Sequence, residues 1–145
     1  MRALTGKAAG RKRTRPLLLY LWYTDCEPCR EHFIDVERIW REYNARGLDV
    51  AAVSVAPMDN KEKITGHFAA NAAVTQSSPQ VPLYLLTGEL NEELSADVFQ
   101  KDWEVTVPSA FGYNKRGQMV FMHTAIDGDY YAALKKAAEK LLAAR

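Results

Sequence analysis

Two cysteines, Cys26 and Cys29, are the residues of this chain best suited to chemistry. They are its only cysteines, and they form a Cys-x-x-Cys pair with Glu27 and Pro28 between them. Such a pair either forms a reversible disulfide or supplies two ligands to a metal ion. Two cysteines cannot staple a small secreted scaffold, and a chain of this length needs no staple. The spacing therefore leaves a redox pair or a metal site.

The sequence around the pair predicts the elements that position it. Residues 17–23 are a continuous apolar run with the length of a strand that is buried on both faces. From residue 27 to residue 46, apolar residues recur at helical spacing. Pro28 suits the first turn of this helix, and Gly47 suits its C-terminal cap. The cysteines are thus expected where a buried strand ends and a helix begins.

That position predicts different roles for the two thiols. The N-terminus of a helix presents unpaired backbone N–H groups and the positive end of the helix dipole, and both favour a thiolate. Cys29 lies one turn further along and can reach back to close a disulfide. We therefore predict Cys26 as the nucleophile that forms a mixed disulfide and Cys29 as the residue that resolves it.

The metal alternative has few further ligands to draw on. A closed zinc site takes four ligands, and the chain adds only the histidines His32, His67 and His123. Haem attachment requires a histidine directly after the second cysteine, where this chain has Arg30. A copper site needs both cysteines and one histidine, such as His32 or His123. A copper-binding metallochaperone or adaptor is therefore the alternative function, and a peroxidase acting through a cysteine sulfenate is a second rival.

Strands and helices alternate along the rest of the chain. We expect strands over 48–56 and 81–86, helices over 61–73, 91–103 and 129–144, and a hairpin of 105–113 with 119–123. Alternation predicts parallel strands joined by right-handed crossovers, and the hairpin adds antiparallel strands. The expected fold class is α/β, with a central mixed β-sheet flanked by helices.

Length and charge limit the classes of function. The 145 residues are the size of one domain. The net charge of +1 hides six basic and no acidic residues within 1–16, so the remainder carries −5. That remainder lacks the clustered cations that bind phosphates, which argues against a nucleic-acid partner. We expect a flexible basic segment over 1–16 and one domain over 17–145, acting as a monomer.

The basic residues followed by residues 17–23 imitate a signal peptide. No small-residue cleavage site follows the apolar run, and seven apolar residues fall far short of the ~20 that span a bilayer. We expect a buried strand here, and we expect any export signal or anchor upstream of Met1.

Two motifs resemble the thioredoxin superfamily. Leu18–Arg30 is similar to its active-site strand and helix start, and most similar to extracytoplasmic TlpA/ResA-type thiol–disulfide oxidoreductases, some of which carry Cys-Glu-Pro-Cys. Thr106–Phe111, followed by Asn114–Val120, resembles the family's cis-proline segment and the hairpin after it. The resemblance covers residues 17–144.

The resemblance implies a thioredoxin-like fold and thiol–disulfide exchange with protein cysteine pairs. It implies a reductant of the cytochrome c maturation type in the bacterial periplasm or cell envelope, although a cytoplasmic location stays open. Apocytochrome c and an upstream membrane electron donor are the implied partners. No organic cofactor and no metal are needed, because the electrons reside on the two sulfurs.

The resemblance also implies a partner-binding surface. Val107–Pro108 is expected to be a cis peptide beside the cysteines, exposing the Val107 backbone for strand-like pairing with a bound polypeptide. An ordinary trans proline is the alternative. Trp22 and Asp25 are the other residues expected to contact a partner. The segment 80–103 either shapes a groove for that partner or only decorates the domain.

Several positions depart from the family pattern. Thioredoxin has a buried acid where this chain has Tyr20, and TlpA/ResA-type proteins often have glutamate where it has His32. Proton transfer to and from the buried thiol needs a titratable group, so we predict that His32 or Glu31 supplies it. Asp25 either opposes the Cys26 thiolate, making the pair more reducing, or points into solvent. Glu27 lies inside the motif, where changes tune the reduction potential.

Overall fold

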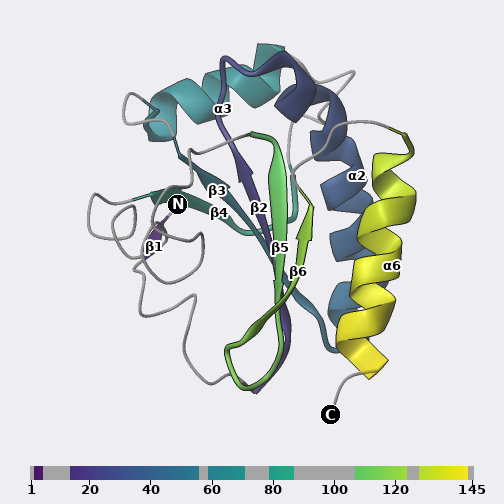
Figure 1. Cartoon of the computed structure of the whole chain (residues 1–145). Helices are drawn as coiled ribbons and strands as arrows, with labels where there is room; N and C mark the ends of the chain where they lie inside the picture. Colours follow the sequence, from purple (N-terminus) through teal and green to yellow (C-terminus); the bar gives the residue numbers. More distant parts are fainter. Residues whose placement is uncertain are drawn as a thin grey trace, which may run out of the picture.

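A six-stranded mixed β-sheet is the centre of the molecule. The computed structural model describes residues 2–4, 14–55, 59–70, 79–86, 107–123 and 128–143. The strands are β1 (Arg2–Leu4), β2 (Leu17–Trp22), β3 (Asp49–Ser54), β4 (Leu83–Leu86), β5 (Ser109–Tyr113) and β6 (Met119–His123). Their order is β1-β4-β3-β2-β5-β6 (Figure 1). The first four of these run parallel, and β5 and β6 are antiparallel to their neighbours, as the alternation and the hairpin predict.

Three α-helices are described with this sheet: α2 (Glu27–Tyr43), α3 (Lys61–Ala70) and α6 (Tyr130–Ala143). α2 and α6 lie side by side (Figure 1). A Cβ at Gly112 in β5 would meet side-chain atoms of Leu141 and Phe121 at 3.0 Å. Glycine at this position therefore lets α6 approach the sheet closely. Within the described residues, no helix is both long enough and apolar enough to cross a membrane.

Strand β2 is buried on both faces, as its apolar run predicts. Residues Leu18, Tyr20 and Trp22 join one hydrophobic cluster with side chains of α2, α3 and α6. The alternate residues Leu17, Leu19 and Leu21 join a second cluster with side chains of β3 and β5. The end of β2 is thus held in the core of the molecule, directly before the cysteines.

Most element boundaries lie close to their predicted positions. The first helix ends at Tyr43, and a short 3₁₀ turn over Asn44–Arg46 leads to Gly47, whose φ of 107° is the left-handed conformation that glycine favours. The predicted helix over 91–103 lies outside the described residues.

The prediction of a basic segment without secondary structure is wrong for Arg2–Leu4. These residues form β1, which pairs in parallel with β4. Strand pairing of this kind needs only backbone groups and the free edge of a sheet, so the apolar pattern of residues contains no signal for it.

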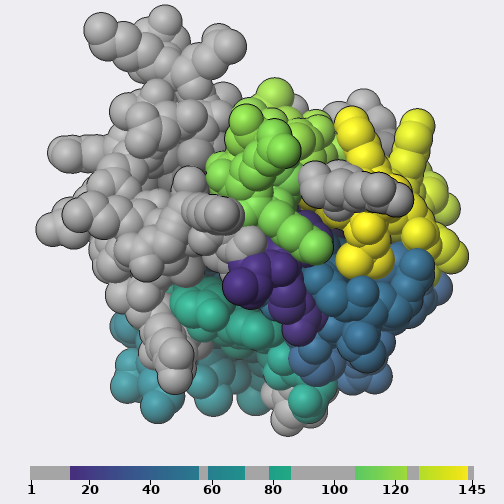
Figure 2. Space-filling model, turned by 90° about the horizontal axis from the view of Figure 1, so that it is seen from below, coloured from purple at the N-terminus to yellow at the C-terminus, as the bar shows by residue number. Residues whose placement is uncertain are grey.

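The end of the molecule away from the cysteines is formed by several chain segments. Viewed from below, the β5–β6 turn, the start of β2 and the end of α6 come together (Figure 2). A pocket of about 290 Å³ lies there, lined by Arg15, Arg46, Lys115 and Leu141 among others. Arg15 pairs with Asp49 at 3.2 Å.

Candidate active site

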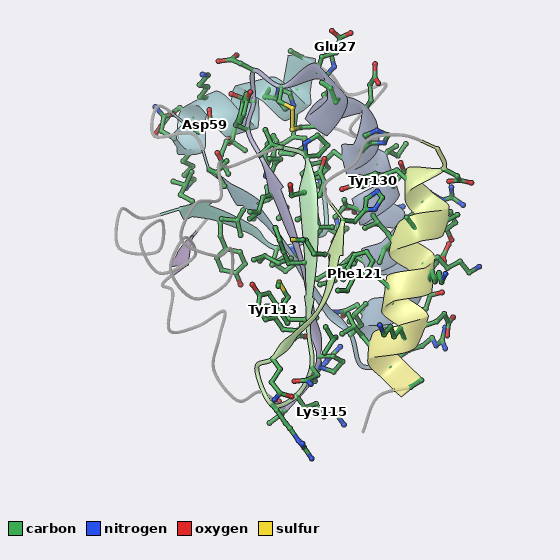
Figure 3. The ribbon with its side chains drawn as sticks, in the orientation of Figure 1. Glu27, Asp59, Tyr113, Lys115, Phe121 and Tyr130 are labelled. Carbon is green, nitrogen blue, oxygen red and sulfur yellow. A yellow bond between two sulfur atoms is a disulfide. The ribbon has the colours of Figure 1, made fainter. Side chains whose placement is uncertain are left out.

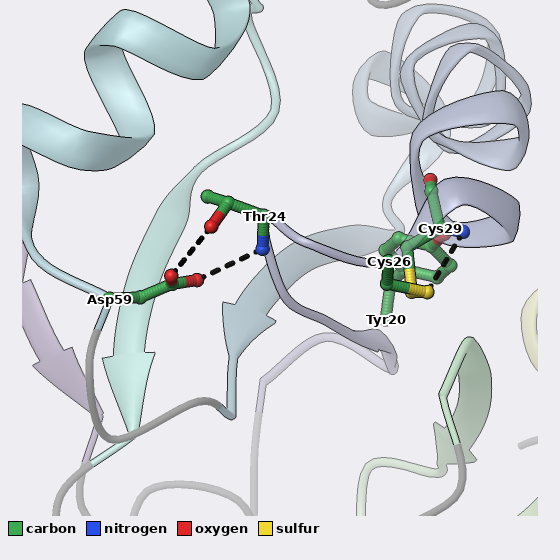
Figure 4. The surroundings of a disulfide bond; sticks show 5 residues. All are labelled: Tyr20, Thr24, Cys26, Cys29 and Asp59. Atoms are coloured by element: carbon green, nitrogen blue, oxygen red, sulfur yellow. Dashed lines mark hydrogen bonds between the residues drawn. A yellow bond between two sulfur atoms is a disulfide. The ribbon is translucent and has the colours of Figure 1, made fainter.

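Cys26 and Cys29 form a disulfide at the N-terminus of α2. Their Cα atoms are 5.2 Å apart. Cys26 is the N-cap residue, and its Sγ accepts a hydrogen bond from the backbone N–H of Cys29 at 3.2 Å (Figure 4). Pro28 lies in the first turn, as predicted. Cys26 is 6% exposed and Cys29 is fully buried, so Cys26 is the sulfur that a partner can reach.

The loop that leads into Cys26 is held by a buried carboxylate, that of Asp59. Its oxygens accept hydrogen bonds from the backbone N–H of Thr24 at 3.1 Å and from the Thr24 hydroxyl at 2.7 Å (Figure 4). The Ser54 hydroxyl, at the end of β3, donates a third hydrogen bond at 2.5 Å. Asp59 therefore ties the end of β3 to the turn before the first cysteine.

The charge of Asp59 is stabilised by these donors. Burial alone would raise the pKa of this carboxyl group, but the hydrogen bonds from Ser54 and Thr24 lower it below its ordinary value. The Asp59 side chain does not cap α3. The side chain of Asn60 caps α3 instead, accepting a hydrogen bond from the backbone N–H of Lys63 at 2.8 Å.

Tyr20 lies directly beneath the second cysteine. Its hydroxyl donates a hydrogen bond to the backbone carbonyl of Cys29 at 2.9 Å. Burial raises the pKa of Tyr20 well above its usual value, so the hydroxyl keeps its proton and remains a donor. Thioredoxin has a buried acid at this position, whereas this chain has Tyr20, a neutral hydrogen-bond donor.

Of the two predicted proton-transfer residues, only His32 packs against the core. The His32 ring stacks on Tyr130 with 4.3 Å between ring centroids, and its Nδ1 lies 3.4 Å from a carboxylate oxygen of Asp35. Glu31 is exposed. Sequence reasoning missed Asp35 and Tyr130 as neighbours of His32. The i,i+3 spacing of His32 and Asp35 on one helix is the signal that would have found Asp35.

Val107 and Pro108 are two of the residues that we expect to face a partner. The Val107–Pro108 peptide is cis, and Val107 packs against the cluster that contains both cysteines. In the register of β2 and β5, Leu21 faces Ser109, so Pro108 continues toward the cysteine end of the sheet.

The prediction that Trp22 contacts a partner is wrong. Trp22 is 1% exposed, and its ring centroid lies 5.0 Å from that of Phe33 and 5.6 Å from that of Phe68. The alternation of β2 points this side chain into the core between α2 and α3.

The acidic residues at the rim are exposed and paired. The Asp25 side chain is 70% exposed, and its carboxylate lies 2.9 Å from the Lys63 ammonium nitrogen. Glu27 is also exposed and pairs with Arg30 at 3.7 Å. Figure 3 shows Glu27 at the cysteine end of the molecule and Lys115 at the opposite end.

Among the described residues, no group of three or more His, Cys, Asp or Glu side chains comes together as a metal site. His123 lies near Tyr130, with 5.4 Å between ring centroids, and His67 lies against Trp22 at 5.6 Å.

Comparisons with known proteins agree with the fold. No family model matches the sequence, and the comparison with curated proteins finds no relative. Among solved structures, a thiol:disulfide interchange protein of the thioredoxin family from Chlorobium tepidum TLS is similar, with a TM-score of 0.69 and 14% identity over 88% of this chain and 80% of that one.

Two further solved structures are similar to this chain. StoA from Bacillus subtilis has a TM-score of 0.60 and 16% identity, over 90% of this chain and 81% of its own. A secreted Mycobacterium tuberculosis disulfide oxidoreductase homologous to Escherichia coli DsbE has a TM-score of 0.64 and 9% identity, over 90% of this chain and 84% of its own. The chain therefore has the thioredoxin-like fold, with a Cys26–Cys29 disulfide at the N-terminus of its first long helix.

Proposed function

We propose that this protein is a thiol–disulfide oxidoreductase that exchanges its Cys26–Cys29 pair with cysteine pairs of partner proteins. The observation that carries the proposal is the disulfide at the start of α2, with its more exposed sulfur at the N-cap. Thiol:disulfide interchange proteins and a disulfide oxidoreductase among the structural neighbours support it.

The exchange follows from the difference between the two sulfurs. In the reduced protein, the Cys26 thiolate attacks one sulfur of a partner disulfide, and the other partner sulfur leaves as a thiolate that takes up a proton. Cys29 then loses its proton and attacks Cys26 Sγ, which closes the Cys26–Cys29 disulfide and releases the second partner thiol. Two electrons pass to the partner, and no cofactor takes part.

We propose His32 as the group that accepts the Cys29 proton. It lies one turn after Cys29 on α2, where i,i+3 side chains are neighbours, and Asp35 holds its Nδ1. Replacing His32 with glutamine should slow closure of the disulfide about 100-fold, while Cys26 still forms mixed disulfides. If Glu31→Gln slows closure of the disulfide and His32→Gln does not, Glu31 is the group that accepts the proton.

We also propose the direction and setting of the reaction. The protein acts as a monomeric reductant in the bacterial cell envelope, on partners such as apocytochrome c, and an upstream membrane donor reduces it again. Similarity to a secreted oxidoreductase homologous to DsbE supports this setting. The Val107 backbone, at the cis peptide bond, is the proposed pairing edge for the partner chain, and Asp25 is a further proposed contact with that chain.

Trapping the mixed disulfide tests the proposal. Reduced Cys29→Ser protein, mixed with insulin as a disulfide substrate, should accumulate a covalent adduct through Cys26 that a reductant releases. Reduced wild-type protein should reduce insulin, and Cys26→Ser should form no adduct. Two results would contradict the proposed exchange: wild-type protein that leaves insulin oxidised, or equal amounts of adduct from Cys29→Ser and Cys26→Ser.

A further inference from the structure

Lys63 of α3 lies between two carboxylates beside the turn that leads into Cys26. Its ammonium nitrogen is 2.9 Å from an oxygen of Asp25 and 3.5 Å from an oxygen of Asp59. The Asp59 side chain is fully buried, whereas that of Asp25 is 70% exposed. One cation thus bridges a buried acid and an exposed acid that belong to different segments of the chain.

Both acids are joined directly to the segment that carries Cys26. Asp25 is its neighbour in the sequence, and Asp59 holds Thr24 through two hydrogen bonds. Cys26 is the N-cap of α2, and its backbone N–H donates to the Tyr23 carbonyl at 3.3 Å. A change of charge on Asp25, Asp59 or Lys63 therefore acts on groups that are linked to the two residues before Cys26.

The charges around Cys26 are more negative without Lys63. The titratable and charged groups around this loop are Asp25, Glu27, Arg30, Asp59, Lys63 and His67. Glu27 and Arg30 pair with each other. Burial and the charge of Arg30 lower the pKa of His67, so that side chain is neutral at pH 7. Asp25, Asp59 and Lys63 together carry a net charge of −1, and without Lys63 this charge would be −2.

We propose that Lys63 is a positioning residue that keeps the Cys26 thiol acidic, by offsetting part of the negative charge of Asp25 and Asp59. A thiolate is disfavoured by nearby negative charge and favoured by positive charge. With Lys63 in place, the two acids oppose the effect of the α2 N-terminus on Cys26 less strongly. This inference rests on the proposed exchange function, in which the Cys26 thiolate is the nucleophile.

The pKa of the Cys26 thiol in the reduced protein tests this role. The rate of Cys26 alkylation by iodoacetamide is followed against pH, with the modified peptide identified by mass spectrometry. Lys63→Met should raise the Cys26 pKa by about half a unit, since Asp25 is largely exposed to water. Alkylation below that pKa should then slow about threefold. Lys63→Arg should restore the wild-type profile.

Two further variants separate charge from structure. Lys61→Met removes a lysine from the exposed start of the same helix and should leave the profile unchanged. The double variant Asp25→Asn/Lys63→Met should return the Cys26 pKa most of the way to the wild-type value, because the exposed acid is gone. The shift in Lys63→Met should shrink in 1 M salt, which screens exposed charges.

Three results would overturn the proposal: an unchanged Cys26 pKa in Lys63→Met, an equal shift in Lys61→Met, or no recovery in the double variant. The alkylation assay needs no partner protein. If wild-type protein fails to reduce insulin but Lys63→Met still raises the Cys26 pKa, the exchange function is wrong and the role of Lys63 stands.

Discussion

Asp59 and Glu37 are two buried carboxylates with similar surroundings and different consequences. Each side chain is fully buried, and each has a basic residue four positions later, Lys63 for Asp59 and Arg41 for Glu37. Each also accepts at least one backbone hydrogen bond from a distant segment, which for Asp59 is the one from Thr24. Glu37, in the middle of α2, accepts such bonds from Gln80 at 2.7 Å and from residue 81 at 3.1 Å.

The difference lies in what each carboxylate holds. Glu37 holds the chain that enters β4, where the carbonyl of Pro82 accepts a hydrogen bond from Ala52 in β3. Asp59 holds the turn that enters Cys26. Both acids contribute to the stability of the fold, but only Asp59 anchors a segment that positions a reactive sulfur. We therefore expect substitutions at Glu37 to change stability alone, and substitutions at Asp59 to change both stability and thiol reactivity.

The largest expected effect is on stability, at Glu37. Glu37→Ala leaves the backbone N–H groups of Gln80 and Val81 without their charged acceptor, and should lower the free energy of unfolding by about 2–4 kcal/mol. The Cys26 thiol pKa should not change. Urea denaturation of the oxidised protein and alkylation of the reduced protein measure the two quantities. A loss below about 1 kcal/mol, or a shifted Cys26 pKa, would remove the contrast with Asp59.

Asp59→Asn should have a smaller effect on stability but should also change thiol reactivity. Loss of charged hydrogen bonds to Thr24 and Ser54 should cost about 1–2 kcal/mol at pH 7. The alkylation rate of Cys26 should change as well, because the turn before it loses its anchor. Wild-type reactivity in a destabilised Asp59→Asn protein would contradict the coupling between this carboxylate and the sulfur.

The stability difference between wild type and Asp59→Asn should depend on pH, because the pKa of Asp59 is lowered in the folded protein. A carboxyl group whose pKa is lower in the folded state stabilises the fold above its unfolded pKa, about 4, and this stability is lost as the pH falls through the folded pKa. The stability difference between wild type and Asp59→Asn should therefore stay constant near neutral pH and decrease below about pH 4. A difference that grows toward acid would contradict the assignment.

The smallest expected effect is at Arg41, the counterpart of Lys63. The Arg41 side chain is half-exposed and lies 3.4 Å from Glu37. Arg41→Met should change the free energy of unfolding by less than about 0.5 kcal/mol, because the guanidinium is half-exposed and Glu37 keeps its two backbone donors. It should leave the alkylation profile of Cys26 unchanged, whereas Lys63→Met shifts it. Equal shifts in the two variants would show that the effect is a general one of net charge.

The sequence predicts the parts of the site that depend on neighbours along the chain. The apolar run before Cys26 and the helical period after it suffice to place the disulfide at the end of a buried strand. The hairpin and the first helix follow from local patterns in the same way. The resemblance of Val107–Pro108 to a known motif adds the cis peptide, which the structure contains.

The rest of the site depends on contacts between distant residues. Thr24 and Asp59 are 35 positions apart, and Glu37 and Val81 are 44 apart, so no local period or spacing relates them. Trp22 was misassigned because a motif gives the residue type but not the face of the strand that it occupies. Strand β1 was missed because an edge strand pairs through its backbone.

The reduction potential of the Cys26–Cys29 couple tests the central claim most directly. It is measured by equilibration against a glutathione or dithiothreitol buffer at pH 7, with the oxidised fraction read by thiol labelling. We predict a reversible two-electron couple near or below about −250 mV, in the range of thioredoxin. A value near about −120 mV would contradict the reductant role. A chain that forms no Cys26–Cys29 disulfide in any buffer would contradict thiol–disulfide exchange itself.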